Sequence, residues 1–287
     1  MDYKGYIGRM IVESAVHLAT ATDVGYLPYV AVLADSLRRV RHPGRRVTLT
    51  VLHTGVPAAD QHRIATVAEG VEVHWVPVPA ELSGSRGADL ADLARRPHYF
   101  RCLLPDLLPG EVSRVIYLDA DTLVEGDLGA LWSVDLQGAP VAAVLDPLAT
   151  ISAAIGPWRE RGLDGDAGYF NSGVLVIDLD AWRATDAGWS AIRHCAADRE
   201  HLVVGGRWAQ HDQYGLNVVF HHRWHRLEPC WNYFTFLPHR SVRVLHFLGS
   251  SGRPGSRYCH PRYTRAFHDA VDRTPWRGWR PQPAGAR

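Results

Sequence analysis

The stretch Val115-Ile116-Tyr117-Leu118-Asp119-Ala120-Asp121 joins an apolar run to two aspartates one residue apart. Its first four residues predict a buried strand. Carboxylates at i and i+2 leave an extended chain on the same side, where they repel each other unless a cation lies between them. Ligands bind outside the carboxyl ends of strands in open α/β sheets. The stretch therefore predicts a site for Mg²⁺ or Mn²⁺, with diphosphate oxygens and waters completing the ligand shell.

Two other interpretations of the paired aspartates are open. Asp119 and Asp121 could simply cap a turn, since aspartate is common after strands. The run Asp119-Ala120-Asp121-Thr122 also fits the motif of haloacid-dehalogenase-like phosphatases, in which the first aspartate is a nucleophile. Those enzymes normally open their fold with this motif and hold the phosphate with a downstream lysine. Here several predicted strands precede the motif and Lys4 is the only lysine, which disfavours a phosphatase, although an arginine could substitute.

On both sides of this stretch, short β-rich runs alternate with amphipathic stretches, which is typical of βαβ units and a largely parallel sheet. Strands are predicted at His17–Ala21, Val47–His53, Val71–Val76, Val115–Leu118, Val141–Leu145 and Gly173–Asp178. Helices are predicted at Leu27–Val40, Asp60–Glu69 and His98–Leu108, with a long helix from about Ala181. The expected fold class is α/β with a central sheet buried on both faces.

Composition excludes several classes of protein. The chain has 287 residues, of which 46% are hydrophobic and 21% charged, as in a globular protein. Lys and Arg total 31 against 30 for Asp and Glu, so no overall positive charge favours binding to nucleic acid.

The four cysteines are scattered and are expected as reduced thiols. Met1–Arg9 lacks the apolar core of a signal peptide, and no run of ~20 apolar residues could span a bilayer, so a cytoplasmic enzyme is expected.

The end of the chain, Thr274–Arg287, is rich in Pro, Gly and Arg and carries Trp276 and Trp279. It predicts either a loosely ordered segment or one docked by its tryptophans. We expect one domain over residues 1–270 and a C-terminal tail over residues 271–287. Peripheral contact of this tail with a membrane is left open.

Several ordered motifs resemble glycosyltransferase family 8, the retaining GT-A-fold enzymes that include glycogenin and bacterial lipopolysaccharide galactosyltransferases. The resemblance runs from about Val16 to Pro254 and is more specific than D-x-D alone. The matching pieces, in chain order, are Ala21-Thr22-Asp23 with Tyr26, Arg101, Tyr117–Val124 with Leu131-Trp132, Phe170–Val174, Asp212-Gln213 with Asn217, and His246–Gly249. The resemblance implies a single GT-A (Rossmann-like) nucleotide-diphospho-sugar transferase domain with a C-terminal extension.

The resemblance also implies roles for individual residues. Asp119, Asp121 and His246 would hold the metal, and an imidazole ligand favours Mn²⁺ over Mg²⁺. Asp212 and Gln213 would place partial negative charge beside the anomeric carbon. The donor-binding residues would be Asp23 and Tyr26 at the uracil, Arg101 at the diphosphate or sugar, Asp146, Asn171 and Ser172 at the sugar, and Gly249 and Arg253 in the phosphate loop.

The phosphate loop departs from the family pattern. The family usually continues as G-x-x-K-P-W, whereas this chain has Gly249-Ser250-Ser251-Gly252-Arg253-Pro254-Gly255, one residue longer and with Arg and Gly in place of Lys and Trp. Arg253 can neutralise a phosphate bidentately, but its reach differs from that of an ammonium group.

The function implied is a retaining, metal-dependent hexosyltransferase that uses a UDP-sugar. The acceptor would be a glycan, a lipid-linked sugar or a small metabolite, and no nucleic acid is involved. Two routes to retention stay open, front-face attack and a covalent intermediate on Gln213. A non-catalytic nucleotide-sugar-binding protein is the alternative from another class, because the phosphate loop is altered.

Overall fold

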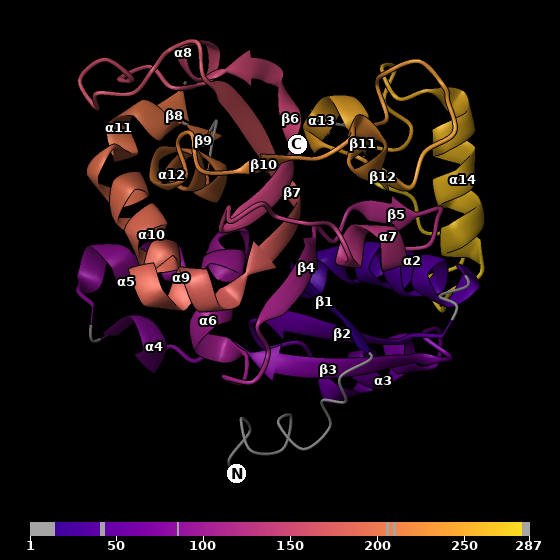
Figure 1. Cartoon of the computed structure of the whole chain (residues 1–287). Coiled ribbons are helices and arrows are strands. Elements are labelled where there is room, and N and C mark those ends of the chain that lie inside the picture. Colours follow the sequence, from indigo (N-terminus) through magenta and orange to yellow (C-terminus); the bar gives the residue numbers. More distant parts are fainter. Residues whose placement is uncertain (1–14, 41–43, 85, 205–206, 209–210, 283–287) are drawn as a thin grey trace. The chain divides into compact units, whose positions relative to one another are not determined.

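The computed structural model describes residues 15–40, 44–84, 86–204, 207–208 and 211–282. This part of the chain divides into two compact units. The first unit contains residues 76–117 and 134–227, and the second contains residues 15–75, 118–133 and 228–282. Helices alternate with the strands of a mostly parallel main sheet (Figure 1), which confirms the predicted α/β class.

The second unit begins with β1 (Ala15–Thr22), which pairs in parallel with β2 (Arg46–His53). Strand order in this part of the main sheet is β1-β2-β3. A smaller sheet has the order β11-β12-β5, with β12 antiparallel to β5. The other elements of the unit are η1 (Val24–Tyr26), α2 (Leu27–Arg39), α3 (Ala58–Ala65), β3 (Val71–Pro77), β5 (Thr122–Val124), α7 (Gly129–Trp132), η3 (Pro229–Trp231), β11 (Tyr233–Phe234), β12 (Val244–His246), α13 (Gly249–Gly252) and α14 (Pro261–Asp272).

The first unit has the strand order β10-β6-β7-β4, in which β10 is parallel and β7 antiparallel to β6. Its helix α10 packs against α12 and η2. The elements are α4 (Glu81–Gly84), α5 (Ala88–Ala94), η2 (Pro97–Leu103), α6 (Leu104–Leu107), β4 (Arg114–Leu118), β6 (Val141–Thr150), α8 (Ile151–Ala154), β7 (Gly168–Asp178), α9 (Leu179–Thr185), α10 (Ala187–Ala197), α11 (Arg199–Leu202), β8 (Val203–Val204), β9 (Arg207–Trp208), α12 (Asp212–Val219) and β10 (His225–Arg226).

The pairing of β6 with β7 is interrupted twice. Ala143 pairs with Leu175 but Val144 pairs with Asn171, so three residues of β7 have no partner on β6. Further along, the register shifts again between Leu145 and Thr150 of β6. Such bulges re-aim side chains and are common beside active sites. Both interruptions fall on motifs that the sequence singles out, because Ser172 lies in the first and Asp146 in the second.

All six predicted strands are present and start or end within a few residues of their predicted bounds. The prediction of one long helix from Ala181 is wrong, because Asp186 adopts a left-handed backbone (φ 49°) that separates α9 from α10. Aspartate tolerates this conformation better than most residues. The predicted helix at His98–Leu108 is instead the 3-10 helix η2 followed by α6, and Pro105 lies within the first turn of α6. A proline inside a continuous α-helix would remove a hydrogen bond and clash with the preceding turn.

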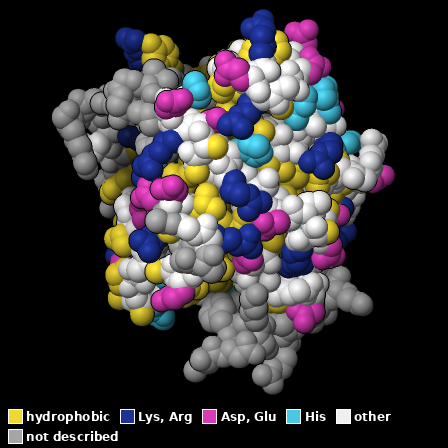
Figure 2. All heavy atoms as spheres, turned by 90° about the vertical axis from the view of Figure 1, so that its left-hand side faces the viewer, with side chains coloured by type: hydrophobic (Ala, Val, Ile, Leu, Met, Phe, Trp, Pro, Cys, Tyr) yellow, Lys and Arg dark blue, Asp and Glu magenta, His cyan; other side chains and the backbone are white. Residues whose placement is uncertain are grey.

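The division into residues 1–270 and 271–287 stays a prediction, and α14 runs across the proposed boundary. Met1–Arg9 and residues 283–287 lie outside the described residues. In the described part of the chain, no helix is both long and apolar enough to cross a membrane. The four cysteines are free thiols. On the face in Figure 2, basic, acidic and histidine side chains are interspersed, in keeping with the near-zero net charge.

Candidate functional site

In the second unit, the structure brings the three predicted metal ligands together. Ligand atoms of Asp119, Asp121 and His246 all lie within 4.8 Å of one another. The imidazole Nε2 is 3.4 Å from Oδ1 of Asp121 and 3.7 Å from Oδ2 of Asp119. The imidazole is buried, whereas the two carboxylates are about one quarter exposed. Two carboxylate oxygens and one imidazole nitrogen, open to solvent on the carboxylate side, fit a divalent cation that also binds diphosphate oxygens.

Strand pairing determines this geometry. Asp119 and Asp121 lie between β4 and β5, and the turn is closed by Thr122, whose N–H and Oγ1–H both donate to the carbonyl of Asp119 (3.1 and 2.8 Å). His246 is the last residue of β12 and pairs directly with Thr122. The next residue, Phe247, donates its N–H to the carbonyl of Asp121 (3.0 Å). The pairing of β12 with β5 thus places His246 beside Asp121, which lies 125 residues earlier in the chain.

Asn232 orients the imidazole of His246, the predicted metal ligand. Its Oδ1 lies 2.8 Å from Nδ1 of His246, and both side chains are buried. With the amide oxygen as acceptor, Nδ1 carries the proton and the lone pair of Nε2 faces the two aspartates. Partners of this kind fix the tautomer of a metal-bound histidine. Asn232 is not predicted from the sequence, because a single asparagine in an aromatic-rich segment has no motif of its own.

Truncation of Asn232 should weaken metal binding. We expect Asn232→Ala to raise the dissociation constant of Mn²⁺ by about tenfold to a hundredfold, because His246 loses the partner that holds its ring and tautomer. Asn232→Asp keeps an acceptor at the same place and should retain most of the affinity. Titration of Mn²⁺ followed by electron paramagnetic resonance measures free metal directly. Equal Mn²⁺ affinity in Asn232→Ala and the unchanged protein would contradict this role.

The predicted base-binding residues lie on the turn that follows β1. Oδ1 of Asp23 accepts hydrogen bonds from the N–H groups of Gly25 (2.8 Å) and Tyr26 (3.2 Å), which holds the 3-10 turn η1. Tyr26 is 40% exposed. Burial and then the Asp121 carboxylate raise the pKa of Tyr26, while Arg253 acts in the opposite direction. These charges lie near the phenol, so the predicted base, metal and phosphate residues of this unit share one neighbourhood.

The predicted phosphate loop, Gly249–Gly255, begins with the short helix α13 (Gly249–Gly252). Gly249 has φ 58°, a left-handed conformation that favours glycine. The N–H of Gly252 donates to the carbonyl of Leu248 (2.9 Å), and its carbonyl accepts from Oγ1 of Thr235 (2.7 Å). Arg253 follows directly, and its Nη1 donates to the main-chain carbonyl of Gln282 (3.2 Å).

In the first unit, the amide of Gln213 is held at both ends. Its Nε2 donates to Oδ2 of Asp146 (3.1 Å), and its Oε1 accepts from the N–H of Ser172 (3.0 Å). Nδ2 of Asn171 donates to the same oxygen of Asp146 (2.9 Å). A carboxylate only accepts hydrogen bonds, so Asp146 dictates which end of each amide faces it. The structure thus brings four of the predicted residues into one hydrogen-bonded group.

Arg101 and Asp212 form a buried ion pair in the same unit, with 2.8 Å between Nε and Oδ2 and about 4% exposure on each side chain. The guanidinium also donates to the carbonyl of Ser172 and lies 4.4 Å from the ring centroid of Tyr117. Arg101 is therefore paired with Asp212. Asp106, five residues after Arg101, accepts instead from the indole of Trp189 (2.8 Å).

Two neighbours complete the surroundings of Asp212 and Gln213. Burial, with smaller effects from His98 and Arg101, lowers the pKa of His211 to about 4. His211 is thus neutral at pH 7, so the ion pair of Asp212 is made by Arg101. Asn217 ties α12 to β7, since its Oδ1 accepts from the N–H of Phe170 (2.8 Å) and its Nδ2 donates to the Phe170 carbonyl (2.9 Å).

The model of the family described as Glycosyl transferase family 8 matches residues 17–251, which is most of the chain. The chain belongs to this family. General stress protein A of Bacillus subtilis (strain 168) is 25% identical to it over 279 residues, covering 89% of this chain and 93% of that protein. Glycosyltransferase GlyB of Streptococcus pneumoniae serotype 4 is 32% identical over 137 residues, covering 48% of this chain and 28% of that protein. The chain thus spans most of the first relative and under a third of the second.

Solved structures show the same fold. The galactosyltransferase LgtC, in complex with donor and acceptor sugar analogues, aligns with this glycosyltransferase at a TM-score of 0.72 and 22% identity, covering 91% of this chain and 96% of that chain. The apo structure of the bifunctional glycosyltransferase WbbM aligns at a TM-score of 0.73 and 18% identity, covering 93% of this chain and 51% of that chain. The predicted family and fold are confirmed.

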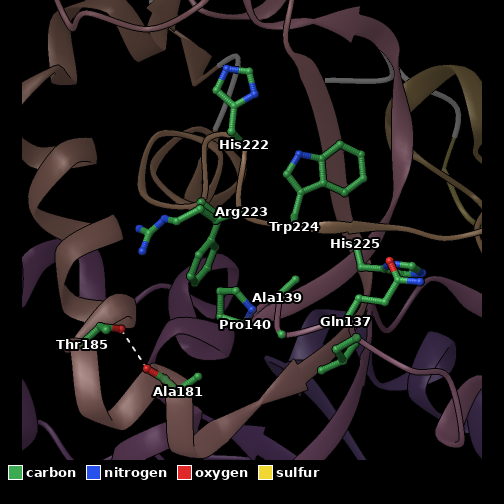
Figure 3. Close-up of a pocket in the computed structure, with 12 residues that line it drawn as sticks. Gln137, Ala139, Pro140, Ala181, Thr185, His222, Arg223, Trp224 and His225 are labelled. Carbon is green, nitrogen blue, oxygen red and sulfur yellow. Dashed lines mark hydrogen bonds between the residues drawn. The ribbon is translucent and has the colours of Figure 1, made fainter.

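The first unit of this glycosyltransferase also has a cavity of about 490 Å³ that contains none of the predicted site residues. Figure 3 shows its lining, which comes from the turn before β6, from α9 and from the segment between α12 and β10. Phe220 and Pro140 line its apolar part, while Gln137, Arg223 and His225 supply polar groups. The cavity and the predicted sugar-binding residues therefore lie in different parts of the first unit.

Proposed function

We propose that this family 8 glycosyltransferase is a retaining hexosyltransferase that uses a UDP-sugar donor, Mn²⁺ or Mg²⁺, and a hydroxyl acceptor on a glycan, a lipid-linked sugar or a small metabolite. The observation that carries the proposal is the cluster of Asp119, Asp121 and His246, with His246 oriented by Asn232. These three residues would hold the cation. When bound, it supplies positive charge to the leaving diphosphate.

The proposal assigns Asp23 and Tyr26 to the uracil base. The exposed fraction of the Tyr26 ring supports stacking, and the hydrogen bonds of Asp23 hold the turn that presents it. Arg253 and Gly249 would bind the diphosphate. A phosphate oxygen carries negative charge and forms a stronger hydrogen bond with a guanidinium than a main-chain carbonyl does. Phosphate should therefore replace the Gln282 carbonyl as the partner of Arg253.

The proposal assigns the sugar to Asp146, Asn171 and Ser172, and the anomeric carbon to Gln213. The fixed amide of Gln213 supports this role, because the N–H of Ser172 (3.0 Å) and, at longer range, its hydroxyl (3.5 Å) hold the Oε1 atom in one place. A preorganised partial negative charge stabilises an oxocarbenium-like carbon without reorganisation during the reaction. Asp212 and Arg101, which were predicted to act on donor atoms, would in this arrangement also hold Ser172 in place through their ion pair.

A thermal-shift panel of nucleotide sugars, with and without Mn²⁺, tests the proposal, because a bound ligand raises the melting temperature by mass action. We expect the largest shift with a UDP-hexose and Mn²⁺, slow release of UDP without an acceptor, and an α-linked product from an α-linked donor.

Binding without any release of UDP would support a non-catalytic binding protein. A phosphorylated form of the protein, detected by intact mass, would support the phosphatase interpretation of Asp119 instead. A β-linkage in the product would contradict retention.

Removal of Arg253 should weaken UDP binding selectively. A charge-assisted hydrogen bond contributes roughly 1.5–3 kcal/mol, so Arg253→Ala should raise the dissociation constant of UDP about tenfold to a hundredfold. Uridine has no phosphate and should bind nearly unchanged. Arg253→Lys should restore part of the affinity, since a point charge cannot bind bidentately. Calorimetric titration of both ligands measures this. Equal losses for uridine and UDP would show that Arg253 supports the loop without contacting phosphate.

A further inference from the structure

Trp279, in the segment after α14, packs against the aromatic residues of the second unit. Its ring lies edge-on to Tyr29 of α2, with centroids 5.3 Å apart and planes at 78°. Phe267 of α14 contacts both rings, at 5.2 Å from Tyr29 and 6.5 Å from Trp279. Edge-to-face contacts at such separations are favourable beyond the apolar area that they bury. Trp276 also has a contact, since the guanidinium of Arg63 lies 4.3 Å from its ring centroid. The described part of the predicted tail is therefore docked by its tryptophans.

Tyr29 in turn supports Tyr26. The two rings are stacked, with centroids 5.1 Å apart and planes at 27°. Tyr29 is only 6% exposed, whereas Tyr26 is 40% exposed. A chain of ring contacts thus runs from Trp279 through a buried tyrosine to the exposed tyrosine proposed as the base platform. Trp279 and Phe267 pack against Tyr29 and hold its ring in place. Because Tyr26 is stacked on Tyr29, the orientation of the Tyr26 ring depends on these contacts.

The same segment reaches the proposed phosphate-binding arginine. The carbonyl of Gln282, three residues after Trp279, accepts the hydrogen bond from Arg253. The segment is anchored on both sides of Trp279. Arg63 donates to the carbonyl of Pro275 (3.1 Å), and Arg280 binds the carboxylate of Asp272 through two nitrogens (2.9 and 2.7 Å). These contacts keep the indole of Trp279 in one place.

We propose that the segment of residues 274–282 is a structural part of the donor site and that Trp279 is a positioning residue, which holds Tyr26 for the nucleotide base through Tyr29. The proposal rests on the proposed function, in which Tyr26 stacks on the base. Trp279 does not touch the donor. Its removal leaves Tyr29 free to change its ring orientation, and Tyr26 then loses the surface on which it is stacked.

The experiment compares two tryptophans with similar contacts. Trp75 of β3 lies edge-on to His53, at 5.6 Å and 74°, and like Trp279 it is half-buried. Trp279→Ala and Trp75→Ala therefore remove the same side chain and the same kind of ring contact. Calorimetry measures the dissociation constant of uridine. We expect a rise of roughly fivefold to tenfold for Trp279→Ala, the size of one lost aromatic contact, and a change under twofold for Trp75→Ala.

A double-mutant cycle shows whether Trp279 acts through Tyr26. In a Tyr26→Ala background, Trp279→Ala should change the uridine dissociation constant by less than twofold, because the platform is already gone. Trp279→Phe keeps an aromatic ring and should restore most of the affinity. Mn²⁺ affinity should stay within twofold of the unchanged protein in Trp279→Ala, since no metal ligand touches this ring. This last readout separates a local effect from general loss of the fold.

The outcomes are distinct. If the unchanged protein binds uridine and Trp279→Ala binds it equally well, the positioning role is wrong while the proposed function stands. Equal losses of uridine affinity with and without Tyr26 would also overturn the role, because Trp279 would then act independently of the platform. If the unchanged protein binds neither uridine nor UDP, the proposed function itself fails, and the inference with it.

Discussion

Asp119→Asn and Asp121→Asn should each lower turnover by about a thousandfold or more, since each removes a negative charge from the proposed site of the cation that would stabilise the leaving group. The fold should survive, because asparagine has the shape of aspartate and both side chains are partly exposed. Without metal, each variant should be at least as stable as the unchanged protein, because one of two neighbouring like charges is gone.

Two measurements check this first expectation. Release of UDP from the donor identified by the thermal-shift panel gives turnover, and thermal unfolding with and without Mn²⁺ gives the stabilisation by metal, which should vanish in both variants. Asp127→Asn is the matched control. Asp127 is six residues beyond Asp121, and its Oδ1 accepts from the N–H of Gly129 (2.9 Å), a bond that asparagine preserves. Full turnover in both Asp119→Asn and Asp121→Asn would remove the metal site from the mechanism.

Gly215→Ala should destabilise the first unit strongly. A Cβ at Gly215 would lie 2.1 Å from the carbonyl oxygen of Ala191 and 2.8 Å from Sγ of Cys195, and the carbonyl belongs to the backbone of α10. Helices α10 and α12 would have to move apart to relieve this clash, which would disturb their packing against neighbouring elements. We therefore expect a loss of about 3 kcal/mol in the free energy of unfolding. For a chain of this size, that lowers the melting temperature by about 6–12 °C.

The same change should also reduce turnover, because α12 carries Asp212 and Gln213 at its start. Gly110→Ala is the control in the same unit. A Cβ at Gly110 would meet nothing within 4 Å, and the melting temperature should hardly change. Differential scanning calorimetry of the two variants decides the matter. If Gly215→Ala unfolds at the same temperature as Gly110→Ala, then α10 and α12 do not approach each other as closely as described.

Local patterns predict much of this fold because apolar runs fit buried strands whatever their neighbours are. They do not predict where strands continue through polar residues. β6 and β7 extend five residues beyond the predicted Leu145 and before the predicted Gly173, through segments that lack a simple alternation. The break between α9 and α10 at Asp186 is not predicted either, because aspartate occurs both within helices and in left-handed turns.

The candidate site divides in the same way. The paired aspartates indicate a metal because their chemistry and spacing lie within one short segment. His246 stands out among the histidines because it ends a β-like run and precedes a Gly-rich loop, and because it matches the family motif. Pairing of β12 with β5 brings it to the aspartates. Asn232 and Trp279 have no local signature. Their roles follow from contacts with residues 14 and 250 positions away, which only the folded chain supplies.

The interrupted pairing of β6 with β7 has a consequence for how family members diverge. Asp146 and Ser172, which we propose as sugar-binding residues, lie where the ladder has already lost its register, so their side chains are not needed for pairing the strands. The apolar residues that build the sheet lie on either side, as at Ala143 and Leu175. Under the proposed function, substitutions within the interruptions can change which sugar is accepted without removing a hydrogen bond between the strands, as long as the donors that face Asp146 keep an acceptor. Donor preference can therefore diverge between relatives that keep the same sheet.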